Sequence, residues 1–180
     1  MEGISKEDAE AIFRDHSAYV YRTALFLTKS ATLAEDITQD TFLQVFRKYN
    51  SYDPSRPLGP WLYRIMVNIT RNTLRQQKWV SMVKPLPAYD KWDELEEQVI
   101  RNELEKQLWY EVNQLTLKSR EIIVLHYYLG FKLTEIASIL GIPLGTCKSR
   151  LNSALTALGK RIRGGELDNL QEGGDVSETF

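Results

Sequence analysis

The sequence predicts an all-α protein of two small helical domains joined by a short linker, with a helix-turn-helix at the end of the second domain. Apolar residues recur at steps of three and four along most of the chain, and no convincing alternating strand pattern appears. Residues 80–95 lose this periodicity and contain two prolines, which is typical of a domain boundary. We therefore expect domains at residues 1–80 and 96–163, a linker at 81–95 and an acidic flexible tail at 164–180.

The first domain should contain three helices, at about residues 6–29, 32–49 and 60–78. Thr32 and Glu35 have the spacing of a capping box, in which each side chain satisfies the backbone N–H of the other residue. Residues 50–60 combine an Asp-Pro pair, a glycine and two further prolines, so they predict a loop with restricted backbone freedom. Pro60 suits the first position of the third helix.

The second domain should contain four helices, at about residues 96–112, 118–129, 133–140 and 145–163. The last two are interrupted by Gly141-Ile142-Pro143, as in a helix-turn-helix, and Gly141 suits a left-handed position that ends a helix. The predicted inner face of the shorter helix is Leu133, Ile136, Ala137 and Leu140, and that of the longer helix is Cys147, Leu151, Ala154, Leu155, Leu158 and Ile162. The predicted outer face of the longer helix is Thr146, Lys148, Ser149, Asn152, Ser153, Thr156 and Lys160. This polar and basic face suits the major groove of DNA, although an ordinary helical hairpin with a solvated face has the same pattern.

Charge is distributed unevenly, although the net charge is only −1. Residues 114–163 carry eight basic and two acidic side chains, and residues 47–80 carry seven basic side chains against Asp53 alone. Residues 81–113, which lie between them, carry four basic and eight acidic side chains. Two basic segments separated by an acidic one indicate two contacts with a polyanion.

The third predicted helix has a second candidate nucleic-acid face. Leu62, Ile65 and Ile69 fall on one side, and Trp61, Arg64, Asn68, Arg71, Asn72 and Arg75 fall on the other. Arginine and amide groups contact phosphates and base edges, and aromatic rings stack on unpaired bases. The pattern suits partly opened DNA, and it also fits a solvent-exposed helix with a buried Trp61.

The second predicted helix places Asp36, Gln39, Asp40, Leu43 and Arg47 along one side, opposite Ile37, Thr41 and Val45. Two carboxylates four residues apart could bind a metal or act as acid and base. No histidine or third acidic group recurs at ligand spacing, so we interpret this side as a protein interface.

Composition excludes several other classes. Cys147 is the only cysteine, which rules out an internal disulfide and a cysteine-based zinc cluster. The N-terminal residues lack the pattern of a secretory signal, and no run of 18 apolar residues is present, so we expect no membrane insertion and a cytoplasmic location.

Three stretches resemble the extracytoplasmic-function (ECF) sigma factors of bacterial RNA polymerase, within the sigma-70 family. They are AEDITQDTFLQVFRKY at 34–49, WLYRIMVNITRN at 61–72 and LTLKSREIIVLHYYLGFKLTEIASILGIPLGTCKSRL at 115–151. They occur in the order and with the spacing of the family. The resemblance implies a sigma factor that directs core RNA polymerase to promoters in a stress or envelope response. It further implies an anti-sigma factor as a partner, and no catalytic activity, metal, cofactor or small-molecule substrate.

The resemblance also implies roles for particular residues. Residues 1–80 would recognise and melt the minus-10 element, and residues 96–163 would read the minus-35 element. Core polymerase would bind Asp36, Gln39, Asp40, Phe42 and Leu43. The minus-10 element would bind Tyr52, Trp61, Arg64, Asn68, Arg71, Asn72 and Arg75, with a flipped base held beside the loop at 50–60. The minus-35 element would bind Thr146, Lys148, Ser149, Arg150, Asn152 and Ser153, of which the last two replace a basic or aromatic pair found in many relatives.

Three other functions account for part of the sequence. A free-standing helix-turn-helix repressor or activator explains residues 131–163 but leaves the Asp36 face without a role. A helical metal-dependent hydrolase would have to use His16 and His126, which lie on apolar or amphipathic segments that favour structural roles. A protein-binding adaptor would leave both basic faces merely solvated.

Overall fold

The computed structural model describes residues 4–83 and 103–172, and every regular element within these ranges is helical. The first half contains α1 (Lys6–Thr28), α2 (Ala31–Lys48), a 3₁₀ turn (Tyr49–Ser51) and α3 (Leu58–Val83). The second half contains α5 (Glu103–Asn113), α6 (Leu117–Ile123), a π-helical turn (Val124–Tyr128), α7 (Leu133–Leu140) and α8 (Leu144–Glu172). We call these the N-terminal half and the C-terminal half. The all-α prediction is confirmed.

The junction between α1 and α2 lies one residue earlier than predicted. Lys29 adopts a left-handed conformation (φ 60°) and ends α1, so Ser30 is already extended and begins the next helix. Ser30 Oγ accepts a hydrogen bond from the N–H of Leu33 at 3.4 Å. The predicted capping box at Thr32 and Glu35 is therefore wrong, since Thr32 already lies inside α2.

α3 also begins earlier than predicted. The helix starts at Leu58, which makes Pro60 its third residue rather than its first. The first four N–H groups of a helix have no acceptor inside it, so proline is tolerated throughout this first turn. At its other end α3 continues to Val83, five residues beyond the predicted end.

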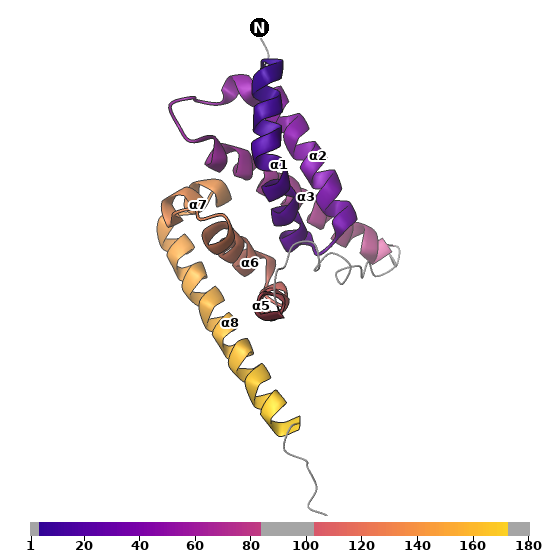
Figure 1. Cartoon of the computed structure of the whole chain (residues 1–180), viewed down its shortest axis with the longest axis vertical. Helices are drawn as coiled ribbons and strands as arrows, with labels where there is room; N and C mark the ends of the chain where they lie inside the picture. Colours follow the sequence, from indigo (N-terminus) through magenta and orange to yellow (C-terminus); the bar gives the residue numbers. More distant parts are fainter. Residues whose placement is uncertain (1–3, 84–102, 173–180) are drawn as a thin grey trace, which may run out of the picture.

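The three helices of the N-terminal half pack around a common core (Figure 1). Its fully buried residues include Val20, Ala24, Leu27, Ala34, Ile37, Val45, Leu62, Met66 and Val67. Thr41 and Thr70 are buried as well, and each hydroxyl donates to the carbonyl oxygen four residues earlier, of Ile37 and Met66 respectively. These bonds remove the cost of burying a polar group in the core.

The helix-turn-helix of the C-terminal half has the predicted geometry. Gly141 is left-handed (φ 65°), and the N–H of Ile142 donates to the carbonyl of Ala137 at 3.0 Å, which closes the end of α7. Ile136, Ala137, Ile139 and Leu140 of α7 and Cys147, Leu151, Ala154 and Leu158 of α8 are buried. Leu155 and Ile162, predicted on the inner face, are each 38% exposed, because they lie at the edge of the stripe.

Two predicted boundaries in the C-terminal half are wrong. The helix expected at 118–129 changes after Ile123 into a π-helical turn. α8 continues to Glu172, so residues 164–172 are helical rather than part of an irregular tail, because two consecutive glycines weaken a helix without ending it. Most of the predicted linker, the first turns of the helix expected at 96–112 and the last eight residues lie outside the described ranges.

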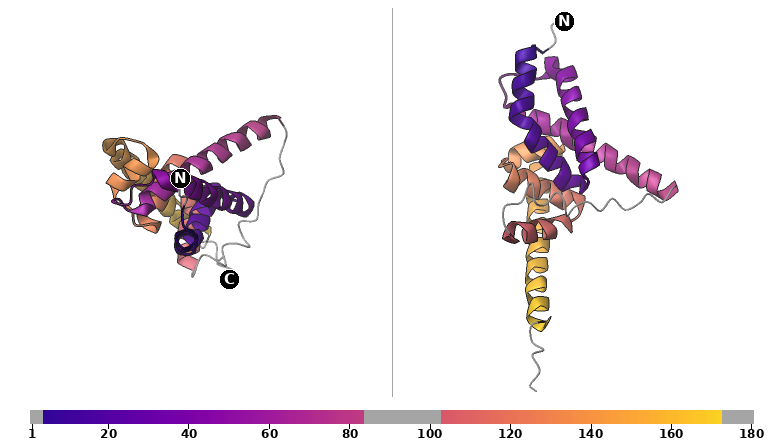
Figure 2. Two further views of the ribbon diagram at one scale, coloured as in Figure 1. Left: turned by 90° about the horizontal axis from the view of Figure 1, so that it is seen from above. Right: turned by 45° about the vertical axis from the view of Figure 1, so that its right-hand side comes forward.

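The N-terminal and C-terminal halves pack directly against each other. α3 contacts α7, and α1 contacts α6, so the buried residues of both halves form one cluster. In Figure 1 the pair α6 and α7 lies beside α1 and α3, while α8 extends away from them. Figure 2 shows that the last turns of α3 project beyond α1 and α2.

Candidate nucleic-acid interface

The outer face of α3 is a continuous polar and basic stripe. Arg64, Asn68, Asn72 and Arg75 are all exposed, at successive steps of four, four and three residues. The buried residues Leu62, Tyr63, Met66, Val67 and Thr70 occupy the opposite side of the helix, so the four polar side chains share one face. The predicted polar face is therefore confirmed for these four residues. Trp61 and Arg71, which were predicted on the same face, are only half-exposed, and the buried side is centred one residue away from the predicted one.

Trp79 continues this stripe and was missed by the sequence analysis, which ended the helix at residue 78. It follows Arg75 by four residues and is 70% exposed, more than any other large apolar side chain of the described part of the chain. It lies on the part of α3 that projects from the bundle (Figure 2). Its ring is therefore available for stacking.

Three aromatic rings surround the start of α3. The ring centroid of Tyr52 lies 5.2 Å from that of Trp61 and 5.8 Å from that of Tyr49. Trp61 is half-buried against the core. It is therefore neither fully exposed for stacking on a base nor fully buried, the two alternatives that the sequence left open. The edge of this cluster is open to solvent, as a site for an unstacked base requires.

The loop between the 3₁₀ turn and α3 is fixed by its own hydrogen bonds. The Tyr52 hydroxyl donates to the carbonyl of Arg56 at 2.5 Å, and Asp53 Oδ1 accepts from the N–H and the hydroxyl of Ser55 at 3.0 and 2.7 Å. The bonds from Ser55 lower the pKa of Asp53, and Arg56 acts in the same direction. The loop is thus preformed and keeps Tyr52 beside Trp61.

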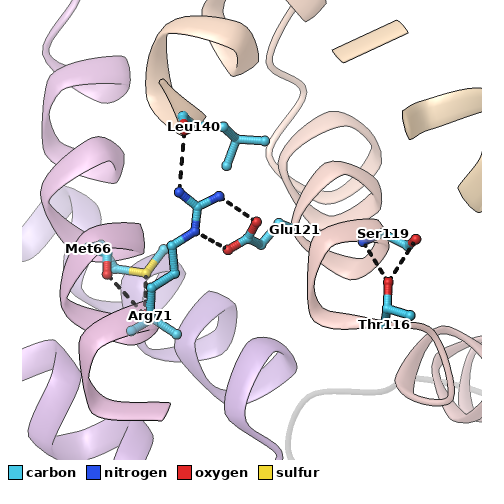
Figure 3. A network of polar contacts seen from close by, with 7 residues as sticks. Met66, Arg71, Thr116, Ser119, Glu121 and Leu140 are labelled. Carbon is cyan, nitrogen blue, oxygen red and sulfur yellow. Dashed lines mark hydrogen bonds and ion pairs between the residues drawn. The ribbon is translucent and has the colours of Figure 1, made fainter. Parts of the chain in front are cut away.

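Arg71 does not lie on the exposed stripe. Its guanidinium forms a bidentate ion pair with Glu121 of α6, which raises the pKa of Arg71, and it also donates to the carbonyl of Leu140 in α7 (Figure 3). The sequence analysis placed Arg71 with the other DNA-facing residues. In this arrangement of the two halves it faces the C-terminal half instead, because α3 packs on α7.

The outer face of α8 agrees with the predicted recognition helix. Lys148, Ser149, Asn152 and Ser153 are exposed, and Thr146 and Arg150 are half-exposed. The hydroxyl of Ser149 donates to the Thr146 carbonyl at 3.0 Å, which leaves the hydroxyl oxygen free to accept. The six predicted residues therefore share the first three turns of α8, where a helix reaches base edges in a major groove.

The outer face of α2 exposes four of the residues that the sequence predicts to bind a protein partner. Asp36, Gln39, Asp40 and Leu43 are exposed, and Leu43 is 51% exposed. Phe42, which is also predicted to bind core polymerase, is only 3% exposed in this structure. The reason is Phe13 of α1, whose ring lies edge-on against Phe42 at 4.9 Å and is itself 50% exposed.

The residues considered for catalysis, His16, His126 and Cys147, are all partly or fully buried. His126 Nδ1 lies 2.9 Å from the carbonyl oxygen of Phe131, and burial lowers the pKa of His16. Burial raises the pKa of Cys147, which disfavours its thiolate. In the part of the chain that the structure describes, no three side chains of the metal-ligating types gather into one group. No helix there combines the length and the hydropathy needed to cross a bilayer.

A helix-turn-helix in one half and an exposed polar and basic helix face in the other define a DNA-binding transcription factor. Family comparison identifies the kind: the model of Sigma-70 region 2 matches residues 12–80, and that of Sigma-70, region 4 matches residues 105–158. The chain belongs to the ECF sigma factors of the sigma-70 family, which direct bacterial RNA polymerase to promoters. Its partners are thus core RNA polymerase and promoter DNA.

Similar proteins cover most of the chain. The ECF RNA polymerase sigma factor SigW of Bacillus subtilis is 31% identical over 167 residues, which is 87% of this chain and 88% of SigW. SigL of Mycobacterium tuberculosis is 31% identical over 150 residues, which is 82% of this chain and 85% of SigL.

Two solved structures share the fold. The sigma factor RpoE of Bartonella quintana, in complex with the anti-sigma factor NepR, has a TM-score of 0.72 at 23% identity and covers 87% of this chain and 98% of its own. CnrH, in complex with the cytosolic domain of CnrY, has a TM-score of 0.67 at 21% identity and covers 89% of this chain and 90% of its own.

Proposed function

We propose that the N-terminal half recognises and melts the minus-10 element, that the C-terminal half reads the minus-35 element, and that the outer face of α2 docks on core polymerase. The observation that carries this proposal is the presence of two exposed polar and basic helix faces on different halves of the chain. Both faces are separate from the acidic face of α2, so polymerase and DNA need not compete for the same residues.

Minus-10 recognition is assigned to the stripe on α3 and the aromatic cluster at its start. Tyr52, Trp61, Arg64, Asn68, Asn72 and Arg75 would contact the opened strand, and Trp79 would extend the contact. Extracting a base costs a few kcal/mol of stacking, and a preformed loop with stacking rings recovers part of that cost. The internal bonds of the loop at Tyr52 and Asp53 support this role.

Minus-35 recognition is assigned to Thr146, Lys148, Ser149, Arg150, Asn152 and Ser153. Lys148 and Arg150 would contribute phosphate contacts, which hold the helix in register without reading sequence. The hydroxyl and amide groups of Ser149 and Asn152 are exposed on the same face and would read base edges.

Core polymerase would bind Asp36, Gln39, Asp40 and Leu43, together with Phe13. This face combines two carboxylates with two exposed apolar side chains, the composition of a protein interface whose apolar centre has a charged rim. The chain would contribute specificity to the polymerase and no catalysis of its own. Its place of action would be the cytoplasm, where the polymerase works.

We also propose an anti-sigma factor as a regulatory partner and a stress or envelope response as the setting. The support is that two proteins that share this fold were solved with a bound protein: RpoE with the anti-sigma factor NepR, and CnrH with the cytosolic domain of CnrY. Binding of the purified chain to proteins from its own cells would identify that partner.

The docking assignment is tested by Asp40→Arg. Reversing an exposed charge at an interface replaces attraction with repulsion and should weaken association with core polymerase by about tenfold or more. The matched control is Asp15→Arg, which makes the same charge change at an exposed position of α1. Affinity for core polymerase and run-off transcription from genomic fragments should both fall for Asp40→Arg alone. Equal affinities for the two variants would contradict the docking face.

A further inference from the structure

The outward side of α8 carries a line of three neutral polar residues. Ser149, Asn152 and Thr156 follow one another at steps of three and four residues, so they share one side of the helix. All three side chains are exposed. The side of α8 that packs on α6 and α7 is formed by Cys147, Leu151, Ala154 and Leu158. The neutral line is therefore turned away from the rest of the C-terminal half.

Two cations flank this neutral line, one on each side. Lys148 precedes Ser149 by one residue and Arg150 follows it by one, and each step turns an α-helix by about 100°. The two cationic side chains therefore leave α8 on opposite flanks. In the part of the chain that the structure describes, neither has an ion-pair partner. A helix in a major groove has base edges in front of it and phosphates on both flanks, which matches this arrangement.

The two hydroxyl groups of the line donate within α8 itself. Ser149 Oγ donates to the carbonyl of Thr146 at 3.0 Å, and Thr156 Oγ1 donates to the carbonyl of Asn152 at 2.9 Å. Each hydroxyl can therefore only accept a further hydrogen bond. The side-chain amide of Asn152 has no hydrogen-bond partner among the described residues. Within the line, Asn152 alone is thus able to donate and to accept at the same time.

Adenine is the base whose major-groove edge matches a side-chain amide. Its N6 amino group donates to the amide oxygen and its N7 accepts from the amide N–H, which gives two parallel hydrogen bonds. Guanine presents two acceptors, O6 and N7, and would leave the amide oxygen facing O6. Cytosine and thymine each present a single hydrogen-bonding group in this groove. The hydroxyls of Ser149 and Thr156 supply no further donor that would favour guanine.

We propose that Asn152 determines the specificity of the minus-35 contact by binding one adenine through both groups of its amide. Lys148 and Arg150 hold the phosphates on the two sides of the groove. This inference rests on the proposed function, because it names the base that α8 selects. A bidentate pair discriminates against the wrong bases by roughly five- to 150-fold. The promoters of this factor should therefore share an adenine at the position that faces Asn152, in the third turn of α8.

The test uses holoenzyme formed from core polymerase and the full-length chain. A promoter obtained by run-off transcription from genomic fragments is randomised at its minus-35 element, and the bound duplexes are sequenced. The unmodified chain should select adenine at one position, and Asn152→Ala should reduce that preference about tenfold while it keeps the others. Asn152→Gln should retain the preference, because its amide forms the same two bonds. The matched control is Gln107→Ala, which removes an exposed amide from α5 and should change no preference.

Modified bases test the two hydrogen bonds separately. Replacing the selected adenine by 7-deazaadenine removes N7, and replacing it by purine removes the N6 amino group. Each replacement should weaken binding of the unmodified holoenzyme roughly fivefold and leave binding of Asn152→Ala unchanged. The inference is overturned if Asn152→Ala keeps every base preference, if the preference it loses is not for adenine, or if the modified bases affect both proteins equally. A holoenzyme that selects no sequence at all would instead contradict the proposed function.

Discussion

Replacing Arg120 by methionine should lower the free energy of unfolding by about 2–4 kcal/mol. The guanidinium donates to three carbonyls, of Phe26, Leu27 and Leu115, at 3.1–3.2 Å. Among the described residues, the first two carbonyls have no N–H donor within α1, because the helix closes with the bond from Lys29 to Leu25. Hydrogen bonds from a charged donor contribute about 1.5–3 kcal/mol each.

The net effect is smaller than the sum of these bonds. Burial of the guanidinium costs several kcal/mol and lowers the pKa of Arg120 to about 10, and methionine recovers that cost. The Nε atom also has no partner among the described residues. Arg120 remains charged at neutral pH, so the three bonds stay charge-assisted and still exceed the cost of burial.

Thermal unfolding followed by circular dichroism measures this balance. For a chain of this length, 1 kcal/mol corresponds to about 2–4 °C, so the midpoint should fall by about 4–16 °C. The control is Lys118→Met. It also replaces a cation of α6 by methionine, but at an exposed position. A fall no larger for Arg120→Met than for the control would refute the reasoning that Arg120 satisfies the end of α1.

Two further predictions concern the helix-turn-helix. Gly141→Ala should cost about 1 kcal/mol in chemical denaturation, because a Cβ meets no atom within 4 Å but the left-handed backbone disfavours it. The same substitution at Gly145, which has open space and no positive φ, should not destabilise the protein, and an equal loss at both positions would show that backbone strain is not the cause. Lys148→Ala should weaken DNA binding of the polymerase complex about equally for all sequences and reduce its salt slope by about 1, whereas Lys118→Ala should leave both unchanged. A sequence-dependent loss for Lys148→Ala would indicate base contact instead.

Helix positions were predictable from sequence because they depend on local periodicity. α7 has the predicted bounds, and α1 ends within one residue of its prediction. The errors lie at helix ends, where neighbouring segments decide. Lys29 has a left-handed backbone although it is not glycine. Its residue type therefore did not predict that α1 ends there and that α2 begins early. The continuation of α8 through two glycines is equally invisible to a rule that treats glycine as a helix breaker.

The candidate site was predictable where it depends on one helix and unpredictable where it depends on two. The exposed residues of α3 and α8 follow from helical spacing alone. The burial of Phe42 and the ion pair of Arg71 could not be predicted, because Phe13 and Glu121, which lie far from them in sequence, determine their surroundings. The contacts of Arg120 and Glu121 could not have been assigned from spacing, since they reach α1 and α3 in the other half.

The interface between the two halves combines aromatic contacts with the ion pair of Arg71 and Glu121. This combination suits an interface that can open. Apolar groups of the same shape are often as stabilising as a buried ion pair or more so, so Arg71 and Glu121 are not required for packing strength. An ion pair differs because both partners regain water when the halves separate, and because a phosphate can take the place of Glu121. The apolar contacts therefore favour closure in general, and the ion pair makes that closure sensitive to a polyanion.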